Sequence, residues 1–178
     1  MTTNFKTGFF YGTGAALNVE LGFVPDYVQI VNRTDGDKMH VSWVSKRTMA
    51  FTSGGVNEIK AGHTLVGATS GATATVLAVL ADTGTWAGGD AAGTLILDAK
   101  SIVGTFGSES VYFKGSSSTN DATGAAVGGG GVDLDTEVAG DTVITPYLGV
   151  AGSAAHGFTV ASGASEDAKL FAYAAFAE

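Results

Sequence analysis

Short runs in which apolar and polar residues alternate recur along the chain, and glycine-rich turns separate them. A period of two places alternate side chains on opposite faces, which is the pattern of half-buried β-strands. Residues 27–31 and 39–44 follow this pattern most clearly, and in the second run Trp43 shares a face with Met39 and Val41. We expect Trp43 to lie in the core. The pattern predicts an all-β protein.

The middle of the chain holds two similar glycine-rich stretches. Residues 62–80 read GHTLVGATSGATATVLAVL, and residues 108–127 read SESVYFKGSSSTNDATGAAV. Each has an apolar run, a glycine, a Ser/Thr cluster and then small residues ending in valine, and Gly67 and Gly115 hold matching places. A solenoid needs three or more repeats to bury a continuous core. Two copies therefore predict a small module built from two related hairpins.

Residues 73–80 are apolar or small on both faces, which is typical of a strand that is covered on both sides. Val76 lies in this run, and we expect it to be buried deep in the module or against another copy of the chain. Four consecutive glycines at residues 128–131 predict a hinge that leads out of the module. The sequence thus predicts an antiparallel β-sandwich from residues 1–58 and 132–178, with residues 59–131 inserted as a Gly/Thr/Ala-rich β module.

The C-terminal run, residues 168–178, carries two conflicting signals. Ser165 followed by two acidic residues is typical of a helix start, and alanine, leucine and lysine favour helix. However, Phe171, Tyr173 and Ala175 alternate with small residues, and the run closes a chain that is otherwise β. We expect a strand here.

Composition narrows the function classes. The 178 residues are 45% hydrophobic and 15% charged, below the ~25% charged of an average soluble domain, so the chain can bury a core. The net charge of −8 predicts no nucleic-acid partner. The absence of cysteine excludes disulfides and thiolate chemistry. No run reaches the ~18–20 apolar residues of a membrane span, and the N-terminus lacks a signal-like apolar stretch, so we expect synthesis in a cytoplasm without a membrane partner.

Acidic residues give two candidates for a metal site. Asp133, Asp135 and Glu137 would share one face of a strand, where three carboxylates could hold calcium at a subunit contact. The alternative is a solvated edge whose charges oppose aggregation. The DGD sequence that begins at Asp35 resembles a calcium loop, but its twelfth position is Lys46 instead of a bidentate glutamate. We expect no metal at the second site, and the first stays a weak candidate.

The sequence contains no recognisable catalytic constellation. His40, His63 and His156 lie far apart along the chain, with no acidic or cysteine partner at ligand spacing. Ser70 lies in GATSG, which lacks the first glycine of a nucleophile elbow. We therefore expect that the protein is not an enzyme and needs no cofactor.

Several segments resemble proteins of tailed-bacteriophage virions. TGFFYGTG, LGFVPDYVQIVN, GFTV and LFAYAAF resemble parts of small β-sandwich proteins in these particles. AGHTLVGATSGATATV resembles a Gly/Thr/Ala-rich module that is common in phage structural proteins. The segments cover about half of the chain, and the resemblance implies a role in particle structure without catalytic residues.

The resemblance implies one of two structural roles. The first is a head decoration (cement) protein: a homo-oligomer, expected to be a trimer, that binds the major capsid protein on the outer shell of the virion after assembly in the bacterial host cytoplasm. The alternative is a tail-fibre or receptor- or carbohydrate-binding module that uses the loop at residues 82–93. Trp86 in that loop would then be an exposed contact for protein or sugar, although a local packing role also fits.

Overall fold

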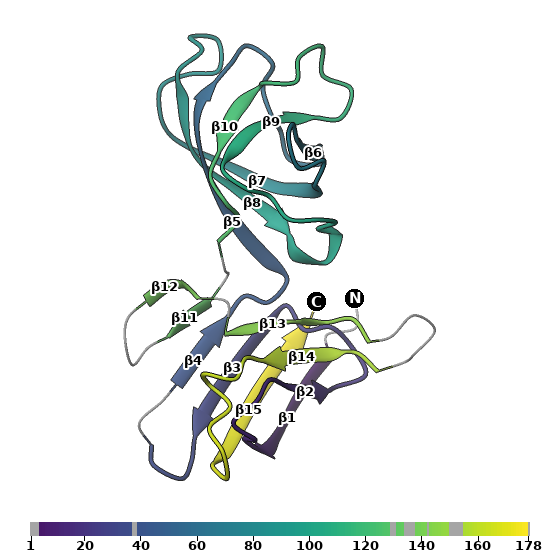
Figure 1. The fold of residues 1–178 in the computed structure, drawn as a ribbon, viewed down its shortest axis with the longest axis vertical. Coiled ribbons are helices and arrows are strands. Elements are labelled where there is room, and N and C mark those ends of the chain that lie inside the picture. The colour runs from purple at the N-terminus through teal and green to yellow at the C-terminus, as the bar shows by residue number, and fades with distance from the viewer. Residues whose placement is uncertain are drawn as a thin grey trace. The chain divides into compact units, whose positions relative to one another are not determined.

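The chain folds into antiparallel β-structure, which confirms the all-β prediction. The computed structural model describes residues 4–36, 39–128, 131–133, 138–141, 143–149 and 155–177. In this part of the chain every strand pairing is antiparallel, and the single helical element is η1, a three-residue 3-10 turn at Ala99–Ser101. The fold divides into two compact units (Figure 1), which are Met1–Ser45 with Gly129–Glu178 and then Lys46–Gly128.

The first unit contains two sheets. The larger sheet has the strand order β1-β15-β3-β4-β11-β12, and the smaller has the order β13-β14-β2. The strands of the larger sheet are β1 (Asn4–Tyr11), β15 (Leu170–Ala177), β3 (Tyr27–Asn32), β4 (Met39–Ser42), β11 (Gly131–Asp133) and β12 (Val138–Asp141). Those of the smaller sheet are β13 (Ile144–Tyr147), β14 (Gly157–Val160) and β2 (Leu17–Glu20).

One apolar cluster joins the two sheets of this unit. The larger sheet contributes Val28, Ile30 and Ala175, and the smaller contributes Ile144 and Phe158, among other side chains. All five are fully or almost fully buried. Alternation explains this directly, because every second residue of a strand points to the same face.

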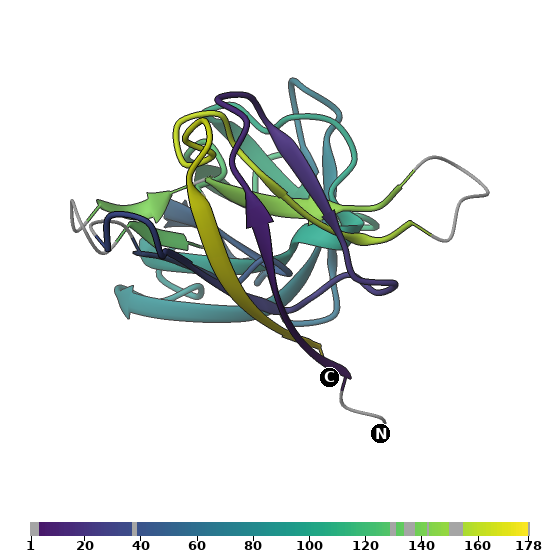
Figure 2. The same cartoon turned by 90° about the horizontal axis from the view of Figure 1, so that it is seen from below.

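The long pairing of β1 with β15 closes the larger sheet at one side. Asn4 lies opposite Ala177 and Tyr11 opposite Leu170, so the two strands run side by side along their full length (Figure 2). The C-terminal run is therefore a strand, as expected. The Ser165 signal that resembled a helix start belongs to the preceding turn, where the buried hydroxyl of Ser165 accepts a hydrogen bond from the Thr13 amide.

The second unit is a closed six-stranded barrel. The barrel order is β10-β5-β8-β7-β6-β9, with β9 pairing back to β10. Its strands are β5 (Lys46–Gly54), β6 (Thr64–Gly67), β7 (Thr73–Thr83), β8 (Ala91–Asp98), β9 (Glu109–Phe113) and β10 (Ala122–Gly124). Closure removes the unpaired edges that an open sheet would leave.

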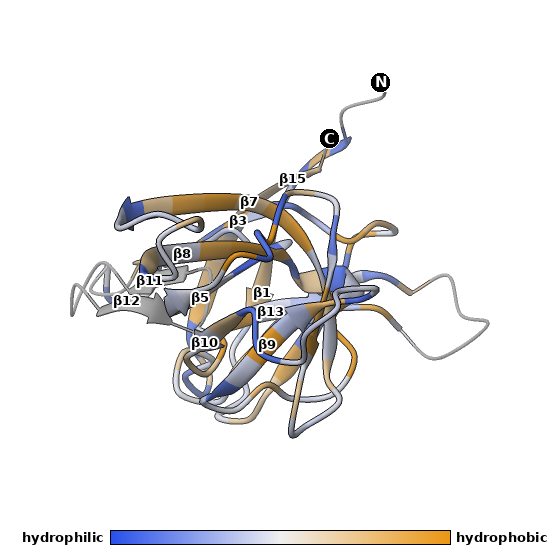
Figure 3. Cartoon of the chain, turned by 90° about the horizontal axis from the view of Figure 1, so that it is seen from above, coloured by the Kyte–Doolittle hydropathy of each residue, from blue (hydrophilic) through white to orange (hydrophobic). Residues whose placement is uncertain are grey.

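The barrel has its own apolar core, separate from that of the first unit. Val76 lies in it at 1% exposure, together with Ala74 of the same strand and Leu97 of β8. Figure 3 shows the hydrophobic colouring along most of β7 and β8. The start of β7 is thus covered inside the barrel, whereas Leu77 and Leu80 further along are exposed.

The two similar stretches form neighbouring hairpins. Residues 62–80 contain the β6–β7 hairpin, residues 108–127 contain the β9–β10 hairpin, and β6 pairs with β9. Their glycines are not equivalent, however. Gly67 ends a strand at a place where a Cβ would lie 2.7 Å from a carboxylate oxygen of Glu109, whereas Gly115 sits in a turn with φ of +94°. The aligned glycines therefore serve different purposes.

The unit boundaries differ from the predicted ones. We expected the inserted module to begin at residue 59 and end at residue 131, but the barrel spans Lys46–Gly128. Residues 46–54 form β5, which pairs with β8 and β10 of the barrel and therefore belongs to it. The barrel sequence lies between β4 and β11, which are paired neighbours in the first unit.

The prediction for Trp43 is wrong. The alternation of β4 is present, but its buried face is the one that carries His40 and Ser42, followed by Val44. Trp43 lies on the opposite face and is 47% exposed. Side-chain size favoured a buried tryptophan, although tryptophan is rarely buried completely.

Candidate interaction surface

One face of the larger sheet packs on the core, and the opposite face is left exposed or half-buried over four strands. We call the latter the outer face. Its members alternate along each strand with the buried residues and lie side by side in the register. They are Phe5, Thr7, Phe9 and Tyr11 of β1, Leu170, Ala172, Ala174 and Phe176 of β15, Tyr27, Gln29 and Val31 of β3, Met39 and Val41 of β4, and Trp43 directly after β4.

Large aromatic side chains of this face are open to solvent. Phe5, Phe9 and Tyr11 of β1 are 67%, 69% and 65% exposed. A single exposed apolar residue is ordinary, but a contiguous set on one sheet is not, because monomeric proteins rarely expose apolar patches larger than a few hundred Å². An exposed apolar patch of this kind is typical of surfaces that contact a protein, a membrane or a ligand.

A row of four aromatic residues crosses one end of the outer face. The register places Phe5 opposite Phe176, Phe176 opposite Tyr27, and Trp43 beside Tyr27. The rings of Tyr27 and Phe176 are stacked with centroids 4.9 Å apart. The ring of Trp43 meets both edge-on, at 5.1 Å from Tyr27 and 6.2 Å from Phe176. Tyr27 and Phe176 therefore each cover one ring face of the other.

The strand sequence explains why the aromatic residues are outside. The opposite face of β1 and β15 already holds large aromatic groups, and Phe10 stacks on the buried Phe171 with ring centroids 5.2 Å apart. Tyr173 packs edge-on against Phe158 of the smaller sheet on the same side. Because successive side chains alternate, Phe9 must point the other way.

The strand positions of the outer face carry no charged residue, and Arg33, whose amide bonds to the Leu170 carbonyl at 2.7 Å, follows directly after β3. The one cation of β1 is Lys6, which lies on the inner side and donates from Nζ to the carbonyl of Leu21 at 3.4 Å. The net charge of −8 therefore resides on other surfaces of the chain. A surface that is depleted of charge and rich in aromatic residues matches the central part of protein–protein interfaces.

A carboxylate holds the turn of the first barrel hairpin. Glu109 of β9 accepts hydrogen bonds from the amides of Thr69 at 2.6 Å and Ser70 at 2.9 Å through one oxygen, and from Gly107 at 3.2 Å through the other. The Ser70 hydroxyl and these amides lower the pKa of Glu109 from 4.5 to about 2. The Ser70 hydroxyl bonds to this carboxylate and also accepts a hydrogen bond from the Ala72 amide at 3.1 Å, so Ser70 helps to hold the turn.

A second carboxylate does the same for the other hairpin. Asp121 is buried and accepts hydrogen bonds from the Ser116 hydroxyl at 2.9 Å, the Asn57 amide group at 3.1 Å and the Phe113 backbone N–H at 3.2 Å. These three donors give each of the two carboxylate oxygens at least one hydrogen bond. Both carboxylates therefore serve barrel architecture.

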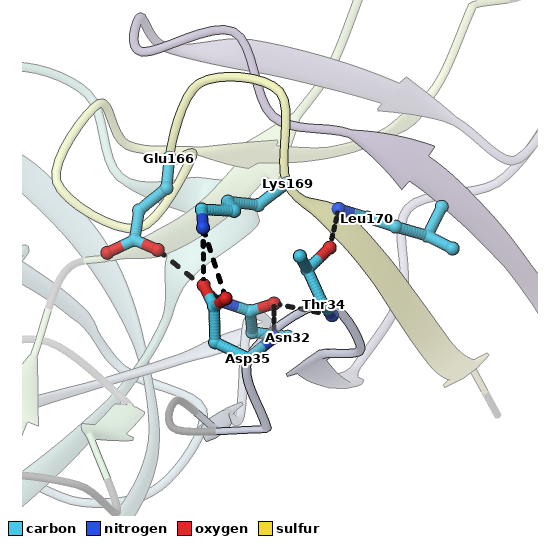
Figure 4. A network of polar contacts seen from close by, with 6 residues as sticks. All are labelled: Asn32, Thr34, Asp35, Glu166, Lys169 and Leu170. Atoms are coloured by element: carbon cyan, nitrogen blue, oxygen red, sulfur yellow. Dashed lines mark hydrogen bonds and ion pairs between the residues drawn. The ribbon is translucent and has the colours of Figure 1, made fainter.

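In the DGD loop, the carboxylate of Asp35 is paired with the ammonium group of Lys169, which lies in the turn before β15. Asp35 contacts the Lys169 ammonium at 2.8 and 3.1 Å, and Asn32 donates to both Asp35 and Glu166 at 3.3 Å (Figure 4). Thr34 accepts from the Leu170 amide at 2.8 Å in the same network. This network ties the loop after β3 to the turn before β15.

The other candidates from the sequence do not converge on a site. Of the acidic trio, only the backbone of Asp133 is described, as the last residue of β11, while Asp135 and Glu137 lie outside the described residues. Within the described ranges, no three or more His, Asp or Glu side chains group as a metal site. In the same part of the chain, no helix is long and apolar enough to cross a membrane.

Trp86 packs on the barrel. Its ring stacks on Phe51 with centroids 5.2 Å apart and an angle of 15° between the planes, and it borders the barrel core. Gly54 lies against it, where a Cβ would approach the ring to 2.9 Å. Val76, the other predicted contact residue, is buried in the barrel core.

Sequence reasoning missed the outer face. A signal is present in β1, where Phe5, Phe9 and Tyr11 lie on one face of the strand, but alternation alone does not show which face is covered. The neighbouring strands β15 and β3 decide which face is covered.

No protein-family model matches the chain, and searches of curated proteins and of solved structures give no significant match.

Proposed function

We propose that this chain is a structural protein of a tailed-phage particle that decorates the outer capsid shell and stabilises it. The uncharged, aromatic outer face carries the proposal, since it is the feature of the described residues best suited to protein–protein contact. The resemblance of several segments to phage β-sandwich proteins suggests that the particle is a phage virion. The major capsid protein is the expected partner on the shell, and the protein is expected to act as an oligomer.

The architecture supports a mechanical role. Two sheets share one core in the first unit, which we interpret as a β-sandwich, and the second unit is a closed barrel with a core of its own. Stacked sheets and closed barrels protect their hydrogen-bonded ladders from water and from further pairing. Such a protein resists deformation while it adds contacts to a shell.

The proposal includes no enzymatic activity. The best-defined carboxylates, Glu109 and Asp121, are each occupied by hairpin donors. His63 accepts from the Lys60 amide through Nδ1 at 3.2 Å and packs on Phe113, so it too has a local role.

The rival role as a carbohydrate-binding module is less well supported. Sugar rings bind by stacking on an open aromatic face, and Trp86 stacks on Phe51 instead. In the aromatic row of the outer face, Tyr27 and Phe176 likewise stack on each other. Their ring edges are better suited to packing in a protein interface, where edge-to-face contacts are favoured.

Add-back to heads tests the proposed function. Purified protein is mixed with heads that lack it, and both the number of bound chains and the temperature of DNA release are measured. We expect saturable binding to the shell and a higher release temperature. Binding to tails or to bacterial surface glycans, with none to heads, would favour the rival.

A further inference from the structure

We propose that the outer face is the contact surface for a second copy of this chain, and that two copies pack face to face through it. This inference rests on the proposed function, because it assigns the homo-oligomer contact of a protein that acts by association.

Charge points to a copy of the same chain. Each chain carries a net charge of −8, so two copies repel through most of their surfaces. The outer face has no charged residue at its strand positions, and contact through these positions therefore brings no like charges together. A strongly basic partner would be expected to meet an acidic face instead, because complementary charge guides association.

The area suits a stable dimer. An aromatic side chain offers about 150–250 Å², so the exposed fractions of Phe5, Phe9, Tyr11 and Trp43 together amount to roughly 500 Å². The half-buried members of the face add to this value. A standard interface takes about 800 Å² from each partner, which is within reach of the whole face.

The outer face combines large and small side chains, which permits two copies to interlock. Ala172 and Ala174 of β15 form a shallow strip between β1 and β3, with Phe9 opposite Ala172 and Thr7 opposite Ala174. Large side chains of one copy can lie over this strip in the other copy. Two sheets packed in this way are about 10 Å apart, as in the core of a sandwich.

Edge-to-edge pairing of β1 is less favoured. β1 is the end strand of its sheet and pairs with β15. Lys6 points to its inner side, and an inward charge on an end strand is a device that opposes the addition of another strand. Edge pairing would also leave Phe5 and Phe9 in water, whereas face packing covers them.

The inference changes the expected symmetry. A face that packs on its own copy is isologous and gives a two-fold dimer, whereas a trimer needs two different complementary surfaces. The other exposed large hydrophobic residues of the described chain are scattered over several elements. They are Val56, Leu77, Leu80, Val103 and Leu148. We therefore expect a dimer where the sequence suggested a trimer.

Sedimentation equilibrium of the full chain tests the contact. Phe9→Glu places a charge on the outer face at a side chain that is 69% exposed, and Val56→Glu places the same charge on a residue that is 78% exposed in the other unit. The parent and Val56→Glu should be dimers. Phe9→Glu should weaken the dimer by roughly 100-fold or more, the effect of losing a hot-spot residue, while its circular-dichroism spectrum stays that of the parent.

Cysteine cross-linking tests the geometry without relying on a charge. The chain has no cysteine, so Ala174→Cys introduces a single thiol at the small-residue strip, and Val56→Cys serves as the control. A short bis-maleimide should link two chains of Ala174→Cys and leave Val56→Cys single. The cross-linking experiment remains informative if Phe9→Glu folds poorly.

The outcomes separate this inference from the proposed function. A monomeric parent at all concentrations, or a dimer that Phe9→Glu leaves intact, overturns the face-to-face contact. If the parent is monomeric and Phe9→Glu loses head binding, the occupant of the face is the shell, and the proposed function survives. If the dimer forms as described but neither form binds heads, the inference stands and the proposed function fails.

Discussion

Replacing Val76 by aspartate tests whether β7 stabilises the barrel from within. Val76 is 1% exposed, lies opposite Leu97 in the β7–β8 register, and belongs to the barrel core. Leu77, its neighbour in sequence, points to the other face and is 41% exposed. Val76→Asp and Leu77→Asp therefore place the same group on the two faces of one strand.

The expected loss is a large part of the stability of the barrel. Leaving a charge buried without a partner costs about 3–5 kcal/mol, and the lost apolar burial of valine adds about 1.5–3 kcal/mol. A domain of this size is stable by about 4–12 kcal/mol in total. Val76→Asp should thus leave the barrel marginally stable or unfolded, whereas Leu77→Asp should cost less than about 1 kcal/mol.

Each unit has one tryptophan, which gives a separate reporter for the barrel. Trp86 stacks on Phe51 in the barrel, and Trp43 lies in the first unit. In a Trp43→Phe background, urea unfolding followed by tryptophan fluorescence reports on the barrel alone. Equal losses for Val76→Asp and Leu77→Asp, or no loss for either, would refute the assignment of β7 to the barrel core.

Three further predictions concern the barrel. Glu109→Gln should make the stability of the barrel less dependent on pH. Folding lowers the pKa of Glu109 from 4.5 to about 2, so the stabilisation by this carboxylate is present above pH 4.5 and is lost as pH falls toward 2. Urea midpoints measured over this pH range, with the exposed Glu58→Gln as the control, would show the difference. Trp86→Ala should destabilise the barrel by about 2 kcal/mol in urea unfolding and leave binding to heads unchanged. If the variant instead keeps the stability of the parent and loses binding to heads, Trp86 is a contact residue. Residues 46–128 alone should fold cooperatively by circular dichroism, because the barrel is closed and Thr48 and Gly128 join its two ends; a chain without a melting transition would contradict this.

Local patterns in the sequence predicted the strands better than the faces. Alternation located β3 and β4 and favoured a strand at the C-terminus, because period two is a property of the backbone itself. It could not tell which face of β4 is buried, and the size of Trp43 favoured the wrong one. The decision depends on sheet neighbours that are more than 100 residues away in β13 and β15, which no local pattern contains.

The same limit explains the boundary and the missed surface. Residues 46–54 follow an ordinary strand pattern, and their membership of the barrel is set by pairing with β8 and β10. Likewise, the carboxylate of Glu109 meets Ser70 only because the two hairpins lie side by side. Val76 was correctly expected to be buried, but the prediction that residues 73–80 are covered on both faces is wrong for Leu77 and Leu80, which are exposed.

Locating the chain in purified phage particles tests the central claim most directly. The particles are labelled on this protein and imaged, and its copies are counted against the major capsid protein. The account predicts on the order of hundreds of copies distributed over the outer surface of the head, in keeping with a stabilising layer that repeats with the shell. A few copies at the tail, or none in the particle, would contradict it.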